Sequence, residues 1–237
     1  MPRPEPSVLT AVAQDYLKVV WAAGEWSTAP VTTKQLAERL GVGAPTVSET
    51  VRRLCDQGLL THVPYGAIEL TATGRAHAVA MVRRHRLLET FLVRELGYGW
   101  DEVHDEAEIL EHAVSDLLVE RLDARLGRPR RDPHGDPIPT AKGQIRRPIG
   151  VARLTEVEAG RYEVIRLSDA DPQRLIRFRD CGLTPGKPVQ VIAHGPRGTT
   201  GLLGDQPRSI VLAPAEARAI WVAPPRTRAM RRTLRNP

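Results

Sequence analysis

The sequence predicts an α+β protein with an amino-terminal winged helix-turn-helix, a central helical region and a small carboxyl-terminal β-barrel. Apolar residues recur at helical spacing as far as about residue 126. A segment rich in proline, arginine and glycine follows, and beyond it short apolar runs alternate with glycine and proline turns. We therefore expect domains at 1–74, 75–127 and 150–224, a linker at 128–149, and a basic tail at 225–237 that has too little apolar surface to fold.

The composition is typical of a globular protein in a reducing compartment. The chain has 237 residues, of which 41% are hydrophobic and 26% charged. No apolar run approaches the roughly 20 residues that cross a bilayer, and residues 1–6 lack the apolar core of a signal peptide. The two cysteines, Cys55 and Cys181, lie far apart and form no CxxC pair, so we expect both to be reduced. The expected location is the cytoplasm, with no membrane partner.

The net charge of +6 is unevenly distributed along the chain. Residues 76–126 hold 6 basic and 11 acidic residues, whereas residues 148–237 hold 15 basic and 8 acidic ones. An acidic central segment favours the binding of cations. Bound divalent cations would also weaken the negative field and ease the approach of an anionic partner.

The first 75 residues predict helices and a hairpin. Residues 7–23 form a helix capped by Ser7 and ended by Gly24. Residues 33–40 and 44–54 form two more helices around a glycine turn, with these positions expected in the core: Ala37, Leu40, Val42, Val47, Val51 and Leu54. Two short strands at 58–63 and 67–71 follow, and together they form a wing.

The helix from residue 44 carries small and polar side chains at its start. In a helix-turn-helix, this end of the second helix enters the major groove and contacts base edges. We therefore expect DNA contacts from Thr33, Lys34, Ala44, Pro45, Thr46, Ser48, Glu49 and Tyr65. The alternatives are a helical hairpin without a DNA role and, for Tyr65 at the wing tip, packing in the core.

Two further helices carry histidines and carboxylates. We expect one helix over 72–96 and another over 101–126, with a break near 115–116. His85 and Glu89 share a face of the first, and the second aligns His104, Glu108, Glu111 and His112 on one side. Imidazole nitrogen and carboxylate oxygen are ordinary ligands of divalent first-row metals, so the pattern indicates a metal site. The alternative is a solvated acidic face.

The rest of the chain predicts fewer helices. We expect His134, in the linker, to be exposed to solvent. Strands are expected at 162–167, 188–192, 209–212 and 219–222, and a short helix around Leu175.

These motifs resemble the diphtheria toxin repressor family. The resemblance extends from about residue 7 to 223 and rests on four segments: Gly43 to Ser48, His85-Arg86-Leu87-Leu88-Glu89, Val103 to Ala107 with Glu111-His112, and His134 to Pro139. It implies a homodimer of three-part subunits, in which the carboxyl-terminal β-barrel is SH3-like. It also implies a metal-dependent transcriptional repressor that binds double-stranded DNA at a palindromic operator.

The resemblance implies two metal sites per subunit. The primary site would be formed by Asp15, Glu108, Glu111 and His112. The ancillary site would be formed by His85, Glu89 and His104, with Asp171 from the SH3-like domain. Gln173 lies one position from the family's second ligand in that domain, where this chain has Arg174.

Departures from the family pattern favour Mn(II) as the co-repressor. The iron-sensing branch has methionine and cysteine where this chain has Asp15 and Glu108, and carboxylate oxygen suits the harder manganese ion. Lys18 replaces a carboxylate of the branch that binds two adjacent manganese ions, which favours separated sites. Glu49 replaces a glutamine of the iron branch and can accept a hydrogen bond from cytosine N4, so the operator should differ.

We therefore expect a manganese-dependent repressor of metal-uptake genes, with no catalytic residue and no small-molecule substrate. An Fe(II)-dependent repressor of iron-uptake genes is the alternative. A metallohydrolase is more remote, because the sequence has no HExxH motif, no Cys/His nucleophile pair and no glycine-rich phosphate loop. A winged-helix regulator that responds to a small molecule or a protein is a further alternative.

Overall fold

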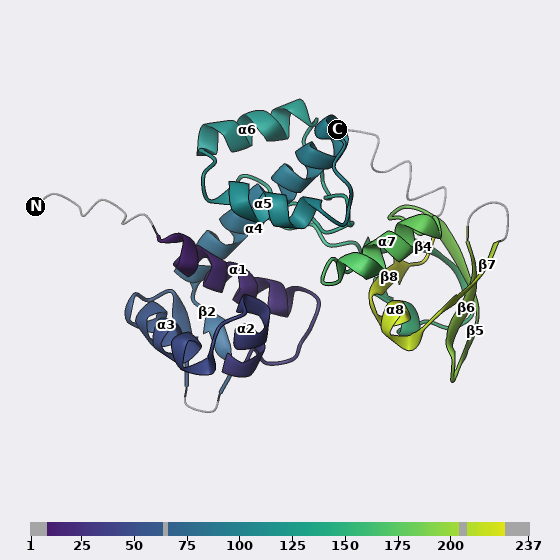
Figure 1. The fold of residues 1–237 in the computed structure, drawn as a ribbon, viewed down its shortest axis with the longest axis horizontal. Coiled ribbons are helices and arrows are strands. Elements are labelled where there is room, and N and C mark those ends of the chain that lie inside the picture. Colours follow the sequence, from purple (N-terminus) through teal and green to yellow (C-terminus); the bar gives the residue numbers. More distant parts are fainter. Residues whose placement is uncertain (1–8, 64–65, 204–207, 226–237) are drawn as a thin grey trace, which may run out of the picture. The chain divides into compact units, whose positions relative to one another are not determined.

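The computed structural model describes residues 9–63, 66–203 and 208–225 (Figure 1). Ser7, Tyr65 and the tail from residue 226 lie outside these residues, so the predictions about them stay predictions. The chain divides into two compact units, which are described separately. The first comprises residues up to 85, with 111–114 and 139–145; the second comprises 86–110, 115–138 and the chain from 146.

The first unit contains the predicted helix-turn-helix. Helices α1 (Ala11–Glu25), α2 (Thr33–Leu40) and α3 (Ala44–Asp56) lie together with the hairpin of β1 (Leu60–His62) and β2 (Ile68–Leu70) (Figure 1). Thr32 begins α2 with a capping box, and Gly41 ends it with φ of 66°, a conformation that glycine adopts without strain. The fully buried core of this unit includes Leu17, Leu36, Val47, Leu54 and Ile68.

Three details of this unit differ from the sequence prediction. Helix α1 is capped by Thr10, whose side chain accepts a hydrogen bond from the Ala13 backbone N–H. The helix continues through Gly24 to Glu25, because a glycine weakens a helix without ending it when neighbouring residues pack. Val42 was expected in the core, but 38% of its surface is exposed.

The long helix α4 (Ala72–Leu96) begins in the first unit and continues into the second. It is followed by α5 (Val103–Glu111) and α6 (Asp116–Arg125), so the predicted break near residue 115 is confirmed. Ser115 begins α6 by accepting a hydrogen bond from the Leu118 N–H. No helix of the described residues has the length and hydropathy that crossing a membrane requires.

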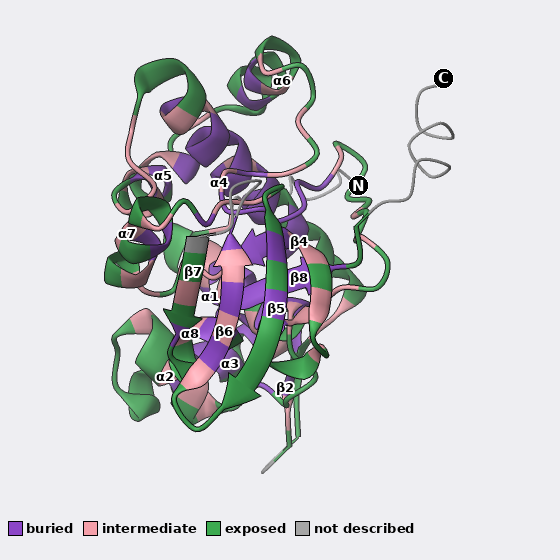
Figure 2. Cartoon of the chain, turned by 90° about the vertical axis from the view of Figure 1, so that its right-hand side faces the viewer, coloured by how far each residue is buried: buried purple, intermediate pink, exposed green. Residues whose placement is uncertain are grey.

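The second unit also contains a six-stranded antiparallel sheet. Its order is β3-β8-β4-β5-β6-β7. The strands are β3 (Ala152–Arg153), β4 (Gly160–Leu167), β5 (Pro188–Gly195), β6 (Gly198–Leu203), β7 (Arg208–Leu212) and β8 (Ile220–Ala223). The short helices are η1 (Leu154–Glu156), α7 (Pro172–Asp180) and α8 (Pro214–Arg218). Buried and partly buried positions alternate along β6, visible in Figure 2, because successive strand residues face opposite sides of the sheet.

The segment expected as a linker is folded in part. Residues 134–139 are all buried, and the Arg131–Pro137 bridge closes the segment into a compact loop. The prediction that His134 is solvated is wrong, because its side chain is 0% exposed. The loop is held from outside by Arg86, which donates to the Pro137 carbonyl over 2.7 Å, and by Arg166, which donates to Asp136 over 2.6 Å. Because these partners are distant in the sequence, local composition could not reveal the loop.

Candidate metal centre

The first cluster of possible metal ligands lies where the end of α5 meets α1. Asp15 extends from α1, and Glu111 and His112 close α5; one ligand atom of each lies within 4.8 Å of the others. The His112 Nε2 atom is 3.0 Å from Asp15 Oδ1 and 3.7 Å from Glu111 Oε1. Two carboxylates and an imidazole nitrogen are a suitable ligand set for a divalent first-row cation.

Gln14 holds the His112 ring in the orientation that a ligand needs. The Gln14 Nε2 atom donates to the Leu9 carbonyl over 3.1 Å, so the amide oxygen faces the ring. His112 Nδ1 lies 2.8 Å from that oxygen and must donate to it, because an amide oxygen only accepts. In the neutral ring, the lone pair is then on Nε2, the nitrogen that faces Asp15. Sequence reasoning missed Gln14, and no motif distinguishes it from an ordinary helix residue.

Glu111 is fully buried and contacts two basic side chains. Lys18 donates to its Oε1 atom over 2.5 Å, and His85 Nδ1 lies 2.7 Å from its Oε2 atom. Burial raises the pKa of Glu111, but hydrogen bonds and charges from His85 and Lys18 outweigh burial and leave the pKa below its ordinary value. The Glu111 carboxylate is therefore ionised, as a metal ligand must be.

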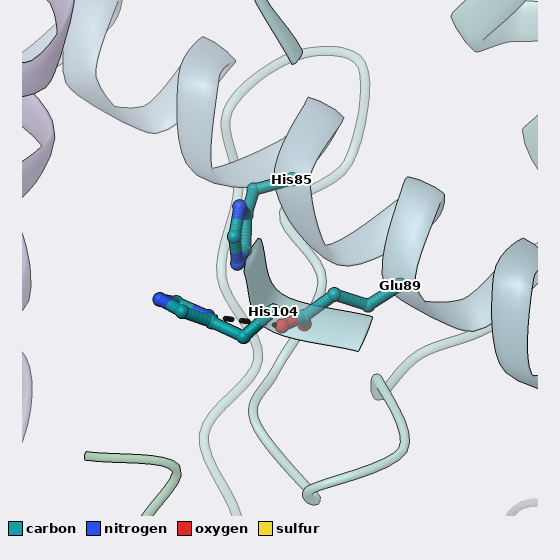
Figure 3. Close-up of side chains that lie close together, drawn as sticks. All are labelled: His85, Glu89 and His104. Atoms are coloured by element: carbon teal, nitrogen blue, oxygen red, sulfur yellow. Dashed lines mark hydrogen bonds and ion pairs between the residues drawn. The ribbon is translucent and has the colours of Figure 1, made fainter. Parts of the chain in front are cut away.

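A second cluster consists of His85, Glu89 and His104 (Figure 3). His85 and Glu89 are one turn apart on α4, and His104 Nδ1 lies 3.3 Å from Glu89 Oε1. Glu89 is 1% exposed, so its charge is costly unless a cation or proton is near. His85 Nδ1 lies 2.7 Å from Glu111 Oε2, so this imidazole is also held by a carboxylate of the first cluster.

Two residues expected as ligands have other contacts. Glu108, expected beside Asp15, belongs to no cluster in the described residues, and its Oε1 atom is 3.6 Å from His104 Nε2. Asp171 caps α7 by accepting from the Arg174 N–H, and its other oxygen pairs with the Arg174 guanidinium over 3.0 Å. From the same segment, Asp169 lies beside Glu89 and His134 instead, a grouping that the sequence did not indicate.

The expected DNA contacts at the start of α3 are on the surface. Ala44, Pro45, Thr46, Ser48 and Glu49 are all exposed, whereas Val47 between them is fully buried. At the start of α2, Lys34 is exposed and Thr33 is partly exposed. One end of α3 therefore presents small and polar groups while its opposite face anchors the helix in the core.

Comparisons with known proteins match all three parts of the chain. Residues 8–68 match the family described as iron dependent repressor, N-terminal DNA binding domain. Residues 71–140 match the iron dependent repressor, metal binding and dimerisation domain, and residues 152–224 match the FeoA domain.

Individual relatives agree with these domain matches. The iron-dependent repressor IdeR of Mycobacterium tuberculosis is 35% identical over 198 residues, covering 77% of this chain and 84% of that protein. The diphtheria toxin repressor of Corynebacterium diphtheriae is 37% identical over 131 residues, covering 55% of this chain and 58% of that protein. A solved structure described as a manganese-dependent transcriptional repressor in complex with manganese is 51% identical to this chain and has a TM-score of 0.86. The alignment covers 90% of this chain and 100% of the solved one. The chain therefore belongs to the diphtheria toxin repressor family, whose members are metal-dependent transcriptional repressors.

Proposed function

We propose that this repressor is activated by Mn(II) and controls metal-uptake genes. The observation that carries the proposal is the cluster of Asp15, Glu111 and His112, in which every ligand atom is oxygen or imidazole nitrogen. Carboxylate oxygens and an imidazole nitrogen suit manganese better than they suit the softer, later metals. The solved manganese-dependent repressor that resembles this chain supports the same choice.

The position of the ligands suggests how binding affects DNA recognition. Asp15 belongs to α1, which packs with α2 and α3 in one core, whereas Glu111 ends α5 and His112 follows it. A bound cation supplies the positive charge that lets the two carboxylates stay close together. Asp15 and His112 then hold α1 against the end of α5. Metal binding favours the orientation of the recognition helix, α3, in which this contact forms. The shift in population is as large as the difference in metal affinity between that orientation and the others.

We propose that the subunits pair through α5 and α6. Three large apolar side chains of these helices are exposed: Ile109 by 71%, Leu117 by 61% and Leu118 by 43%. Large exposed apolar side chains favour a protein contact, and the family model for this region is described as a metal binding and dimerisation domain. A two-fold pair of recognition helices would read a palindromic operator.

The ligand assignments of the proposal combine the clusters with the family resemblance. The primary site consists of Asp15, Glu111 and His112, and Glu108 joins it on rotation away from His104. The ancillary site consists of His85, Glu89 and His104, with Asp171 as the expected ligand from the SH3-like domain.

The test is operator binding measured by gel shift with Mn²⁺, Fe²⁺ under anaerobic conditions, or chelator. We expect tight binding with Mn²⁺ and weak binding with chelator; equal binding in all three would refute the metal switch. Glu108→Ala should weaken the Mn²⁺ response while circular dichroism shows an intact fold. Asp15→Met combined with Glu108→Cys should move the response toward Fe²⁺, since thioether and thiolate ligands are softer.

An Fe(II)-dependent repressor is the second candidate. It is favoured by the mycobacterial relatives, which are described as the iron-dependent repressor IdeR. Dissociation constants for Mn²⁺ and Fe²⁺ decide between the two, and tighter binding of Fe²⁺ together with a stronger DNA response would favour iron.

A further inference from the structure

We propose that the SH3-like domain positions His104, a ligand of the second cluster, through the connection between α4 and α5 (residues 97–102). Trp100 and Asp101 of this connection contact the SH3-like domain, and His104 follows shortly after them in the chain. All of these residues lie in the second unit. The inference rests on the proposed function in one respect, because the position of His104 matters for regulation only if the second cluster binds a metal.

The connection is a tight turn that sets how α5 leaves α4. At its start, the Tyr98 N–H donates to the Leu92 carbonyl of α4 over 3.1 Å. At its end, the Val103 N–H donates to the Gly99 carbonyl over 3.1 Å, and the Gly99 N–H donates to the Glu102 carboxylate over 2.8 Å. Because the turn is bonded to both helices, a shift of its middle residues moves the start of α5.

The two middle residues of the connection are held by the SH3-like domain. Trp100 packs against the apolar core of that domain, which includes the fully buried Phe178 of α7. The Asp101 carboxylate accepts a hydrogen bond from the Arg179 guanidinium over 3.0 Å, and Arg179 also belongs to α7. The apolar contact and the ion pair act at adjacent residues, so together they hold the turn in one orientation.

His104 depends on this support more than the other ligands of its cluster do. Its side chain is 37% exposed, compared with 9% for His85 and 1% for Glu89. His85 and Glu89 lie well inside the long helix α4, whereas His104 lies in the first turn of α5. Helix ends fray, because their first N–H groups have no partner within the helix. The position of the His104 imidazole is therefore set mainly by whatever holds the start of α5.

The contact with the connection gives the SH3-like domain a second way to act on the cluster. The domain was expected to act by donating Asp171, but this side chain caps α7 and pairs with Arg174. The contacts of Trp100 and Asp101 act on the backbone before His104 instead. They support the cluster even while Asp171 keeps its present partners.

Another attachment holds the SH3-like domain independently of the connection. The Leu167 N–H of β4 donates to the His134 carbonyl of the buried loop over 2.9 Å. In the same loop, Gly135 has φ of 97° and passes so close to β4 that a Cβ atom would lie 2.1 Å from the Ile165 carbonyl oxygen. These backbone contacts do not involve α7. Substitutions in the ion pair therefore test the connection without releasing the whole domain.

The experiment measures Mn²⁺ binding to the full chain with Asp15→Asn as the background, which removes a ligand of the first cluster. Free Mn²⁺ is counted by electron paramagnetic resonance, and hydrogen exchange of the Val103 amide is measured in the metal-free protein. We expect Arg179→Gln to raise the Mn²⁺ dissociation constant by about 2- to 5-fold, the effect of a partly exposed ion pair, and to speed exchange at Val103. Trp100→Ala should raise the dissociation constant by about 10-fold, since it removes the apolar contact.

A charge exchange and a matched control separate positioning from general stability. Asp101→Arg and Arg179→Asp should each weaken Mn²⁺ binding, and the double variant should recover most of the loss because it restores an ion pair. The control is Arg177→Gln on the same helix, which removes the ion pair with Glu216 inside the SH3-like domain. Its Mn²⁺ affinity and its exchange at Val103 should equal those of the background protein.

The possible results distinguish this inference from the proposed function. Equal Mn²⁺ dissociation constants in Arg179→Gln, Trp100→Ala and the background protein would overturn the inference and leave the proposed function intact. Exchange at Val103 that rises as much in Arg177→Gln as in Arg179→Gln would also overturn it, because any lost ion pair of α7 would then have the same effect. A background protein that binds no Mn²⁺ would overturn the second metal site of the proposed function. In that case, hydrogen exchange would still decide whether the SH3-like domain holds the start of α5.

Discussion

Gln14→Leu should weaken the binding of Mn²⁺ at the Asp15 cluster without changing the fold. The substitution removes the oxygen that accepts from His112 Nδ1 over 2.8 Å and keeps a similar side-chain volume. Without that acceptor, the ring can carry its proton on Nε2, the nitrogen that faces Asp15 at 3.0 Å. A ring in that form must change tautomer before it can bind a metal.

The magnitude follows from the role of such partners in metal sites. Loss of the group that orients a histidine ligand lowers metal affinity by about 10- to 100-fold. This range corresponds to roughly 1.4–2.7 kcal/mol of binding free energy. Since Gln14 is partly exposed and water can replace part of the hydrogen bond, we expect a value near the lower end.

The assay is a Mn²⁺ titration by isothermal calorimetry together with the Mn²⁺ concentration that gives half-maximal operator binding. Both quantities should shift by similar factors, because metal binding and DNA binding are linked. Gln14→Glu is the matched control: it keeps the acceptor at the same position and should retain or increase the affinity. An unchanged Mn²⁺ affinity in Gln14→Leu would refute the idea that Gln14 orients His112.

Three further predictions concern the stability and assembly of the protein. With chelator present, the interactions of Glu111 should contribute fully to the free energy of unfolding above about pH 4.5, the pKa of the group in the unfolded chain. This contribution should be lost as the pH falls through the lowered pKa of the folded state. In urea titrations, the free energy of unfolding of Glu111→Gln should therefore depend less on pH in this acidic range. Ile109→Glu should weaken dimerisation by about 10-fold or more, measured by sedimentation, because a charge replaces an apolar contact. Gly135→Ala should lower the free energy of unfolding by roughly 2–5 kcal/mol, measured by denaturant titration, since a Cβ atom would meet the Ile165 carbonyl at 2.1 Å.

Each of these predictions has a clear contrary result. If the free energy of unfolding falls equally at acidic pH in Glu111→Gln and in the wild type, the buried ion pairs of Glu111 do not contribute to stability. An unchanged dimer in Ile109→Glu, but a monomer after substitution elsewhere, would place the interface away from α5 and α6. For Gly135→Ala, the control is Gly182→Ala: this glycine also has positive φ, 76°, but a Cβ atom would meet no other group within 4 Å. Equal losses at the two positions would show that backbone strain, and not the close approach, sets the cost.

The sequence predicted the elements that local patterns specify. Residues 33–40 form α2 and 72–96 form α4 as expected, because each has helical periodicity with a cap or breaker at its ends. Strand β6 was missed: its sequence, Gly198 to Leu203, is mostly glycine and threonine, and its position depends on pairing with β5 and β7. Strand pairing is a property of the whole sheet, so weak local patterns cannot reveal it.

The candidate site was predictable where ligands share a helix. Helical spacing alone grouped His85 with Glu89, since residues four apart share a face. The same spacing put Glu108 beside His104, but it could not decide between that neighbour and Asp15, because the contact made by Glu108 depends on its side-chain rotamer. It also missed His134, whose proline- and arginine-rich surroundings are typical of an exposed segment although distant arginines bury the loop.

The ammonium group of Lys18, 2.5 Å from Glu111, has a consequence for the shape of the response to metal. It is a tethered monovalent cation on Oε1, the same Glu111 oxygen that lies 3.7 Å from His112 Nε2, and it leaves that oxygen less able to bridge to a second metal. In the proposed mechanism, the Asp15 cluster therefore fills as an independent one-ion site, with a titration curve no steeper than a simple hyperbola. A sigmoidal dependence of operator occupancy on manganese then reports coupling outside this site, either to the His85 cluster through the His85–Glu111 hydrogen bond or between subunits that join on DNA. Only coupling between subunits makes the steepness of gene repression depend on protein concentration.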